Sequence, residues 1–190
     1  MRTALALVFA LALFAPGCAA DVDHASDEAT TSDDVTAASD TRAKNAIVKA
    51  AAGLSFISES DHVLVWVGSS TVATAPANAA FVHRTFNAVT DNDAMADKPL
   101  ARLKSETVAF DSFASRYVAV AGEDPDNFSY HHEMTRVLNA MRSHLKNPIV
   151  IRVGRKSESG SGLVGAISVY ILGTLPSGKI GGLFTVSVET

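Results

Sequence analysis

Two adjacent histidines, His131 and His132, precede Glu133 in this 190-residue chain and could hold a metal ion. Their spacing argues against a metal site. Adjacent residues on a helix point about 100° apart, and a helical site needs ligands four residues apart on one face. We therefore expect the two histidines to be solvated residues of a first helical turn, and the chain to have no metal site of its own.

Two clusters of carboxylates could serve an acid/base site. One comprises Glu59 and Asp61, and the other comprises Glu123, Asp124 and Asp126. Neither cluster is joined by a histidine or a metal-ligand set with matching spacing, and the chain has no Gly-x-Ser-x-Gly nucleophile elbow. The sequence therefore argues against an enzyme.

Two glycine-rich segments, at residues 160–162 and 178–182, could suggest a phosphate-binding loop. Such a loop leads into a helix, whereas both segments precede expected strands. We therefore interpret them as turns and expect no cofactor.

The end of the sequence, from residue 170 onward, is typical of two strands joined by a tight turn, Pro-Ser-Gly-Lys at residues 176–179. Most chains fray at their ends, so a strand that runs to Thr190 would hold the carboxylate of that residue in a fixed position. A second informative feature is the acidic turn Ser58-Glu59-Ser60-Asp61 near the start of the domain.

Residues 1–17 are expected to be a lipoprotein signal peptide. Arg2 is followed by twelve apolar residues, whereas a membrane-spanning helix takes about 20. The pair Gly17-Cys18 resembles the end of a bacterial lipobox, so Cys18 is expected to be lipidated. The alternative is a soluble exported protein that is cleaved near Ala19 or Ala20. Cys18 is the only cysteine, so no disulfide can form within the chain.

Residues 18–41 are expected to form an acidic, disordered tether, because they have few large apolar residues and their carboxylates repel one another. Residues 42–190 are the expected folded domain. Seven of the 20 acidic residues lie in residues 21–42, which leaves 13 acidic and 14 basic side chains in residues 43–190. Such a near-neutral domain lacks the basic patch that nucleic-acid binding requires, so we expect no direct binding of nucleic acid.

The domain should begin with a helix that has Asp40 as its N-cap, followed by a central strand at residues 62–68. Pro76 should open a second helix, and Asp111 should cap a short one. The longest helix should end before Asn147-Pro148. Its expected inward residues are Tyr130, Met134, Val137, Leu138, Met141 and Leu145. Further strands are expected at 106–110, 149–153, 163–172 and 180–189, in one mixed, largely antiparallel sheet with helices on both faces.

Several short segments of the chain together resemble the nuclease A inhibitor family. They are residues 53–61, residues 65–66 with 110–113, residues 145–148 with 152–154, residues 169–173 and residues 188–190. The resemblance covers about residues 43–190 and implies an α/β (α+β) fold, namely a three-layer α-β-α sandwich.

The resemblance also implies a function. Family members bind and block a Mg²⁺-dependent, non-specific DNA/RNA endonuclease. The Glu of the Ser-Glu-Ser turn and the last Thr of the chain reach the metal region of the nuclease; in this chain they are Glu59 and Thr190. Their neighbours Ser58, Asp61 and Glu189 are therefore expected at the contact.

A third contact of the family is an Asp-Trp pair in the loop before the long helix. Residues 121–127 contain no Trp here, and Glu123 and Asp124 are the expected replacement for the acid. We thus expect a lipoprotein of the bacterial outer membrane that inhibits a metal-dependent endonuclease. The alternative is a tethered surface module of the same fold that binds an unrelated protein.

Overall fold

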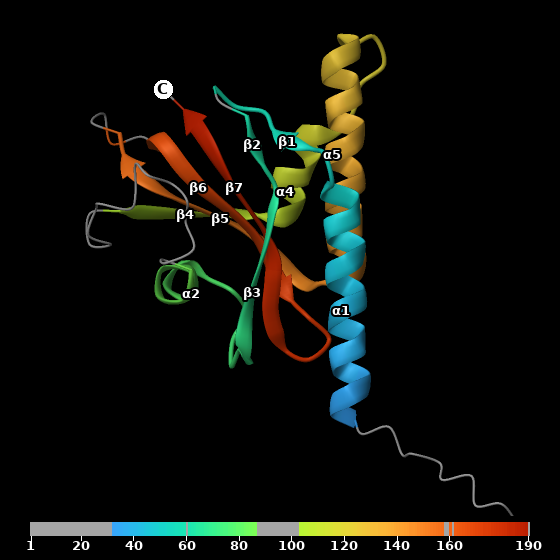
Figure 1. Cartoon of the computed structure of the whole chain (residues 1–190). Helices are drawn as coiled ribbons and strands as arrows, with labels where there is room; N and C mark the ends of the chain where they lie inside the picture. Colours follow the sequence, from blue (N-terminus) through green and yellow to red (C-terminus); the bar gives the residue numbers. More distant parts are fainter. Residues whose placement is uncertain (1–31, 60, 87–102, 158–159, 161, 190) are drawn as a thin grey trace, which may run out of the picture. The chain divides into compact units, whose positions relative to one another are not determined.

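Five antiparallel strands form the main sheet of the chain (Figure 1). The computed structural model describes residues 32–59, 61–86, 103–157, 160 and 162–189. In the order in which they lie side by side, the strands are β3 (Val65–Val72), β7 (Lys179–Glu189), β6 (Leu163–Thr174), β5 (Lys146–Lys156) and β4 (Lys104–Ala109). Every pairing between these neighbours is antiparallel, which confirms the expected α+β class with a largely antiparallel sheet.

The other elements are helices and a small two-stranded ribbon. The helices are α1 (Ser32–Ala51), α2 (Ala79–Thr85), α4 (Phe110–Ala114), the 3-10 helix η2 (Ser115–Tyr117) and α5 (Pro125–His144). The ribbon consists of β1 (Ser55–Phe56) and β2 (His62–Val63), which pair antiparallel. No helix in the described part of the chain is long and apolar enough to cross a membrane.

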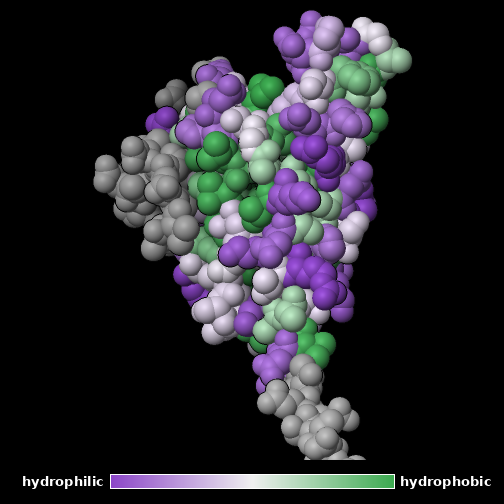
Figure 2. Space-filling view, turned by 45° about the vertical axis from the view of Figure 1, so that its right-hand side comes forward, coloured by the Kyte–Doolittle hydropathy of each residue, from purple (hydrophilic) through white to green (hydrophobic). Residues whose placement is uncertain are grey.

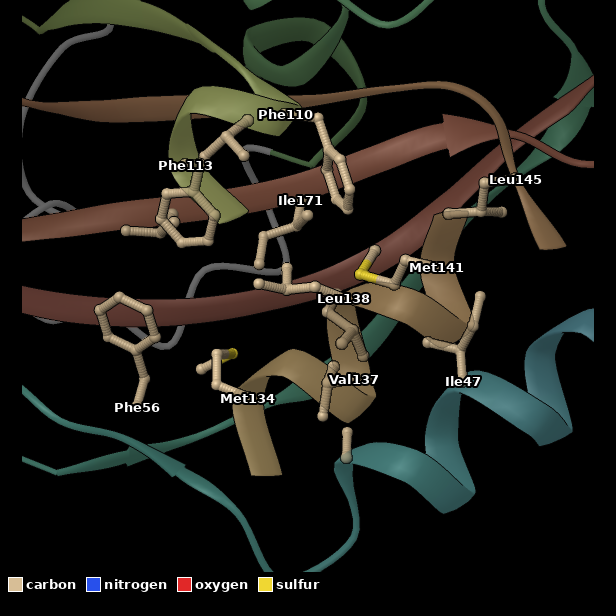
Figure 3. Packing of buried hydrophobic residues seen from close by; sticks show 14 of the residues in the cluster. Ile47, Phe56, Phe110, Phe113, Met134, Val137, Leu138, Met141, Leu145 and Ile171 are labelled. Atoms are coloured by element: carbon tan, nitrogen blue, oxygen red, sulfur yellow. The ribbon is translucent and has the colours of Figure 1, made fainter. Parts of the chain in front are cut away.

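Each face of the sheet carries its own hydrophobic cluster, because neighbouring strand residues point to opposite faces. Val150 and Ile171 belong to the first cluster, and the residues that follow them, Ile151 and Leu172, belong to the second. The first cluster also takes side chains from α1, α4 and α5 (Figure 3). The sheet is thus buried on both faces.

Helix α5 has the inward residues that its spacing predicts. Met134, Val137, Leu138 and Met141 are buried, and α5 lies antiparallel to α1 (Figure 1). The helix begins after Asp124, whose Oδ1 accepts a hydrogen bond from Asp126 N over 3.0 Å. This carboxylate satisfies one of the amide groups that a helix leaves free at its start.

The second face of the sheet is contacted by the seven-residue helix α2. Its Val82 packs with Phe86 against sheet residues such as Tyr170 and Phe184. In the described residues no other helix contributes to this cluster. A full second helical layer, as in the expected three-layer sandwich, therefore stays a prediction.

The prediction of a disordered tether up to residue 41 is wrong for residues 32–41, which lie in α1. Asp33 and Asp34 in the first turn are favourable there because the positive end of the helix dipole attracts carboxylates. Asp40 lies inside the helix and does not cap it. Residues 1–31, with the expected signal peptide, lie outside the described residues.

The expected central strand at residues 62–68 is also wrong, because β3 pairs only with β7 and is an edge strand. Of its apolar residues, Val67 is buried, whereas Val65 and Val72 are exposed. A continuous apolar run is typical of a strand buried on both faces. Here the run is interrupted at residue 64, between β2 and β3.

Two predicted helix starts also differ from the structure. Asn78, and not Pro76, caps α2: its Oδ1 accepts a hydrogen bond from Phe81 N over 2.9 Å. Asp111 lies within the first turn of α4, and the residue before the helix, Ala109, makes no capping bond with its side chain.

Candidate functional site

The acidic turn lies at the tip of the β1–β2 ribbon. Phe56 pairs with His62, so the chain reverses direction between these two residues. Ser58 and Glu59 follow β1, and the side chains of Glu59 and Asp61 are exposed to solvent. A short ribbon therefore presents the predicted carboxylates at its end.

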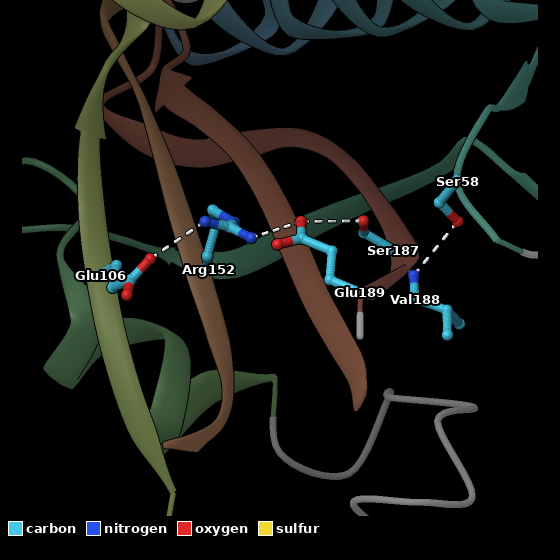
Figure 4. Close-up of polar contacts among 6 residues, drawn as sticks. All are labelled: Ser58, Glu106, Arg152, Ser187, Val188 and Glu189. Carbon is cyan, nitrogen blue, oxygen red and sulfur yellow. Dashed lines mark hydrogen bonds and ion pairs between the residues drawn. The ribbon is translucent and has the colours of Figure 1, made fainter. Parts of the chain in front are cut away.

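The same turn is bonded to the end of β7. The amide of Val188 donates a hydrogen bond to Ser58 Oγ over 3.1 Å, and Glu59 N donates to Val188 O over 3.4 Å. Figure 4 shows the first of these contacts. The structure thus brings together Ser58, Glu59 and the segment around Glu189. Thr190 lies outside the described residues.

A groove of about 530 Å³ adjoins the turn. Its lining includes Glu59 of the turn and Glu189 of β7, together with Arg116 and Tyr117 of η2. The groove holds charges of both signs. It suits a polar surface of a protein partner better than an apolar ligand.

Arg152 lies between two carboxylates at the inner side of this groove (Figure 4). Its Nη1 is 3.0 Å from Glu106 Oε2, and its Nη2 contacts Glu189 Oε1. Ser187 Oγ donates a hydrogen bond to the same oxygen of Glu189 over 3.2 Å. The carboxylate of Glu189, which was predicted to bind the nuclease, thus has partners within the chain.

Sequence reasoning did not single out Glu106 and Arg152. One sequence feature could have pointed to Arg152: it is a charged residue inside the apolar run Ile149-Val-Ile-Arg-Val153. The Arg152 side chain is 16% exposed, and a charge that is buried to this degree needs a partner. The sequence alone does not identify that partner.

Glu123 and Asp124 organise the loop before α5. Glu123 Oε2 accepts a hydrogen bond from Val120 N over 3.3 Å, and Glu123 Oε1 lies 2.9 Å from His131 Nδ1. Asp124 caps α5. Both carboxylates therefore have partners within the loop and the helix that they join.

An aromatic cluster connects this loop to the turn. Tyr117 contacts Tyr130, His131 and Phe56, and the Tyr130 hydroxyl accepts a hydrogen bond from Ile57 N over 3.2 Å. Burial raises the pKa of Tyr117 and of Tyr130 above the ordinary tyrosine value, which further favours the protonated hydroxyl. The expectation that His131 is solvated is wrong, because its side chain packs in this cluster and is 22% exposed. His132 is exposed, as expected.

Among the described residues, no group of three or more His, Cys, Asp or Glu side chains could hold a metal ion. What the site offers is a rigid turn with an exposed carboxylate, beside a polar groove.

Comparison with known proteins identifies a family for the domain. A search of curated proteins finds no significant match. A model of the nuclease A inhibitor-like protein family matches residues 41–190, which include the acidic turn, the groove and the end of β7. The chain therefore belongs to the nuclease A inhibitor-like protein family.

Proposed function

We propose that this domain binds and inhibits a Mg²⁺-dependent, non-specific endonuclease by presenting the carboxylate of Glu59 to the metal region of the enzyme. Membership of the inhibitor-like family suggests a nuclease as the partner and a role without catalysis. The observation that carries the proposal is the position of Glu59, exposed on a turn that is bonded to β7.

The physical basis is competition with the substrate. Mg²⁺ prefers hard oxygen ligands, and in such a nuclease it meets a phosphate oxygen of the nucleic acid. A carboxylate can occupy that position and offers no phosphodiester bond to cleave. Because Ser58 and the Glu59 amide are bonded to Val188, little conformational entropy is lost when the turn docks.

We assign different roles to the other predicted contact residues. Thr190 directly follows β7, and we propose it as the second contact with the metal region. Asp61 belongs to the same turn as Glu59. Glu189, Glu123 and Asp124 are assigned a supporting role, because their carboxylates hold Arg152, His131 and the start of α5.

Substitution of Glu59 by Ala tests the function. The affinity for a Mg²⁺-dependent, non-specific endonuclease should fall about thirty-fold, which corresponds to roughly 2 kcal/mol. The measurement is inhibition of DNA cleavage together with calorimetric binding. The matched control is Asp33→Ala, which removes an exposed carboxylate from the first turn of α1. Equal inhibition by both variants would contradict the proposal.

We further propose that Cys18 is acylated and anchors the protein in the bacterial outer membrane. The support is the pair Gly17-Cys18 after the apolar run of the expected signal peptide. Metabolic labelling with a fatty acid should mark the wild type and leave Cys18→Ser unlabelled. Equal labelling of the two proteins would show that Cys18 is not the lipidated residue.

A further inference from the structure

We propose that Arg152 is a positioning residue for Glu59: by holding the end of β7, it fixes the turn that presents the carboxylate. This inference rests on the proposed function. The contacts run from Glu106 through Arg152 to Glu189, and we call these three residues the carboxylate–arginine triad.

The triad ties together strands that are not neighbours. Arg152 on β5 lies directly opposite Glu106 on β4. Glu189 lies on β7, and β6 runs between β5 and β7. The guanidinium group therefore bridges β4 and β7 (Figure 4). Backbone pairing connects only adjacent strands, so this side chain adds a link that the sheet alone cannot provide.

The fold itself has little need for a charge at this position. Val150 lies two residues before Arg152 on β5, and Val169 lies opposite Arg152 on β6. Both valines belong to the hydrophobic cluster beneath α1 and α5. An apolar residue would suit such surroundings, and replacing a buried ion pair with apolar side chains is often neutral or stabilising. The presence of a charged residue at position 152 is therefore better explained by its role in fixing the end of β7.

The link through Arg152 matters most for the last residues of β7. Strand ends fray, and Glu189 pairs with Gly165, which offers no side chain to pack against. The next residue inward, Val188, makes both bonds to the acidic turn. If the strand end frays, the turn loses its support and Glu59 is no longer held in one place.

The test compares Arg152→Met with Arg142→Met. Arg142 pairs with Asp111 at 2.7 Å on a more exposed surface and does not line the groove. Arg152→Met should weaken inhibition about tenfold and should speed amide exchange at Glu59 and Val188 in the free protein. The denaturation midpoint should fall by less than the loss of a partner from a fully buried ion pair would cause, because the side chains of Glu106 and Glu189 are 35% and 45% exposed and can be solvated. Arg142→Met should change neither inhibition nor exchange at these amides.

Two further variants separate the possible failures. Arg152→Lys, which keeps the charge, should restore part of the affinity. Adding Arg152→Met to Glu59→Ala should cause little further loss, since the first substitution acts through Glu59. If Arg152→Met does not fold, Glu189→Gln must show the faster exchange and the weaker inhibition instead.

The outcomes distinguish this inference from the proposed function. Unchanged inhibition by Glu59→Ala would overturn the proposed function. If Glu59→Ala weakens inhibition while Arg152→Met, or Glu189→Gln in its place, leaves inhibition and amide exchange unchanged, only the positioning role is overturned.

Discussion

Acidic residues have two different roles in this protein. Glu59 is exposed at the tip of the ribbon, where a partner can reach it. Asp40, in contrast, is turned towards the molecule from the middle of α1. Its Oδ1 accepts a hydrogen bond from Ser177 N over 3.0 Å, and its Oδ2 accepts one from the Ser177 hydroxyl. This carboxylate therefore fastens α1 to the turn between β6 and β7.

The Asp40 contact gives a prediction about stability. Hydrogen bonds to a charged group contribute about 1.5–3 kcal/mol, so Asp40→Ala should lower the free energy of unfolding by roughly that amount. The measurement is the urea midpoint at an unchanged m-value. Inhibition should stay as in the wild type, because Glu59 is not involved. A midpoint equal to that of Asp33→Ala would mean that the contact adds nothing.

The elements predicted best from sequence are those whose pattern is local. The long helix and the last three strands appear at the expected places, because helical spacing and β-branched runs fix them without reference to the rest of the chain. The start of α1 and the edge position of β3 were predicted wrongly. The edge position of β3 depends on which strands it pairs with, and no local pattern contains this information. At the start of α1, residues 33–35 are exposed, and the acidic composition predicts a tether although Asp33 and Asp34 favour the start of a helix.

The candidate site, too, could be predicted from the sequence only in its local parts. Ser58 and Glu59 could be identified from a short motif within one turn. The contact of that turn with Val188 joins residues 130 positions apart, and Arg152 reaches Glu189 across β6. Which residues face one another in a sheet follows from strand order and register, and these were unknown from the sequence alone.

The pairing of β6 with β7 leads to a prediction about glycine. A Cβ atom added at Gly182 would lie 2.0 Å from the carbonyl oxygen of Ile171. The carbonyl oxygen belongs to the backbone of β6, and the Cβ would be fixed to the backbone of the paired strand β7. Because neither can move away alone, Gly182→Ala should cost about 3 kcal/mol or more. At Gly68, on the edge strand, the nearest atom is the Trp66 indole nitrogen at 3.4 Å.

The matched variant Gly68→Ala should therefore change the free energy of unfolding by less than about 1 kcal/mol. Thermal and urea denaturation of both variants provide the comparison. Similar losses of stability in the two variants would mean that the strands can move apart to accept the methyl group.

On the scale of the whole molecule, the site and the start of α1 lie at opposite ends (Figure 1). Helix α1 has 20 residues and is therefore about 30 Å long. Its last turn leads directly into the ribbon that carries Glu59, whereas its first turn is remote from the ribbon. The outer surface of α1 and α5 between these ends is mainly hydrophilic (Figure 2).

This geometry suits a domain that is attached through the segment before α1. Within the described domain, the ribbon is separated from the first residue of α1 by the length of that helix. A group fixed before α1 is therefore not expected to cover the ribbon. Attachment and inhibition should therefore not compete.

Coupling through a single thiol tests this expectation. Protein that begins at Cys18 and carries no lipid has one cysteine, so it can be fixed to a bead at that position only. The bead-bound protein should bind the Mg²⁺-dependent endonuclease with an affinity within about twofold of the free protein, because no contact is lost.

The comparison variant combines Cys18→Ser with Val63→Cys, which places the thiol on β2 at a side chain that is 62% exposed. This variant should bind in solution but lose binding once it is coupled, since the bead then covers the ribbon. If coupling at Cys18 blocked binding as strongly as coupling at residue 63, the expectation that attachment before α1 leaves the site accessible would be wrong.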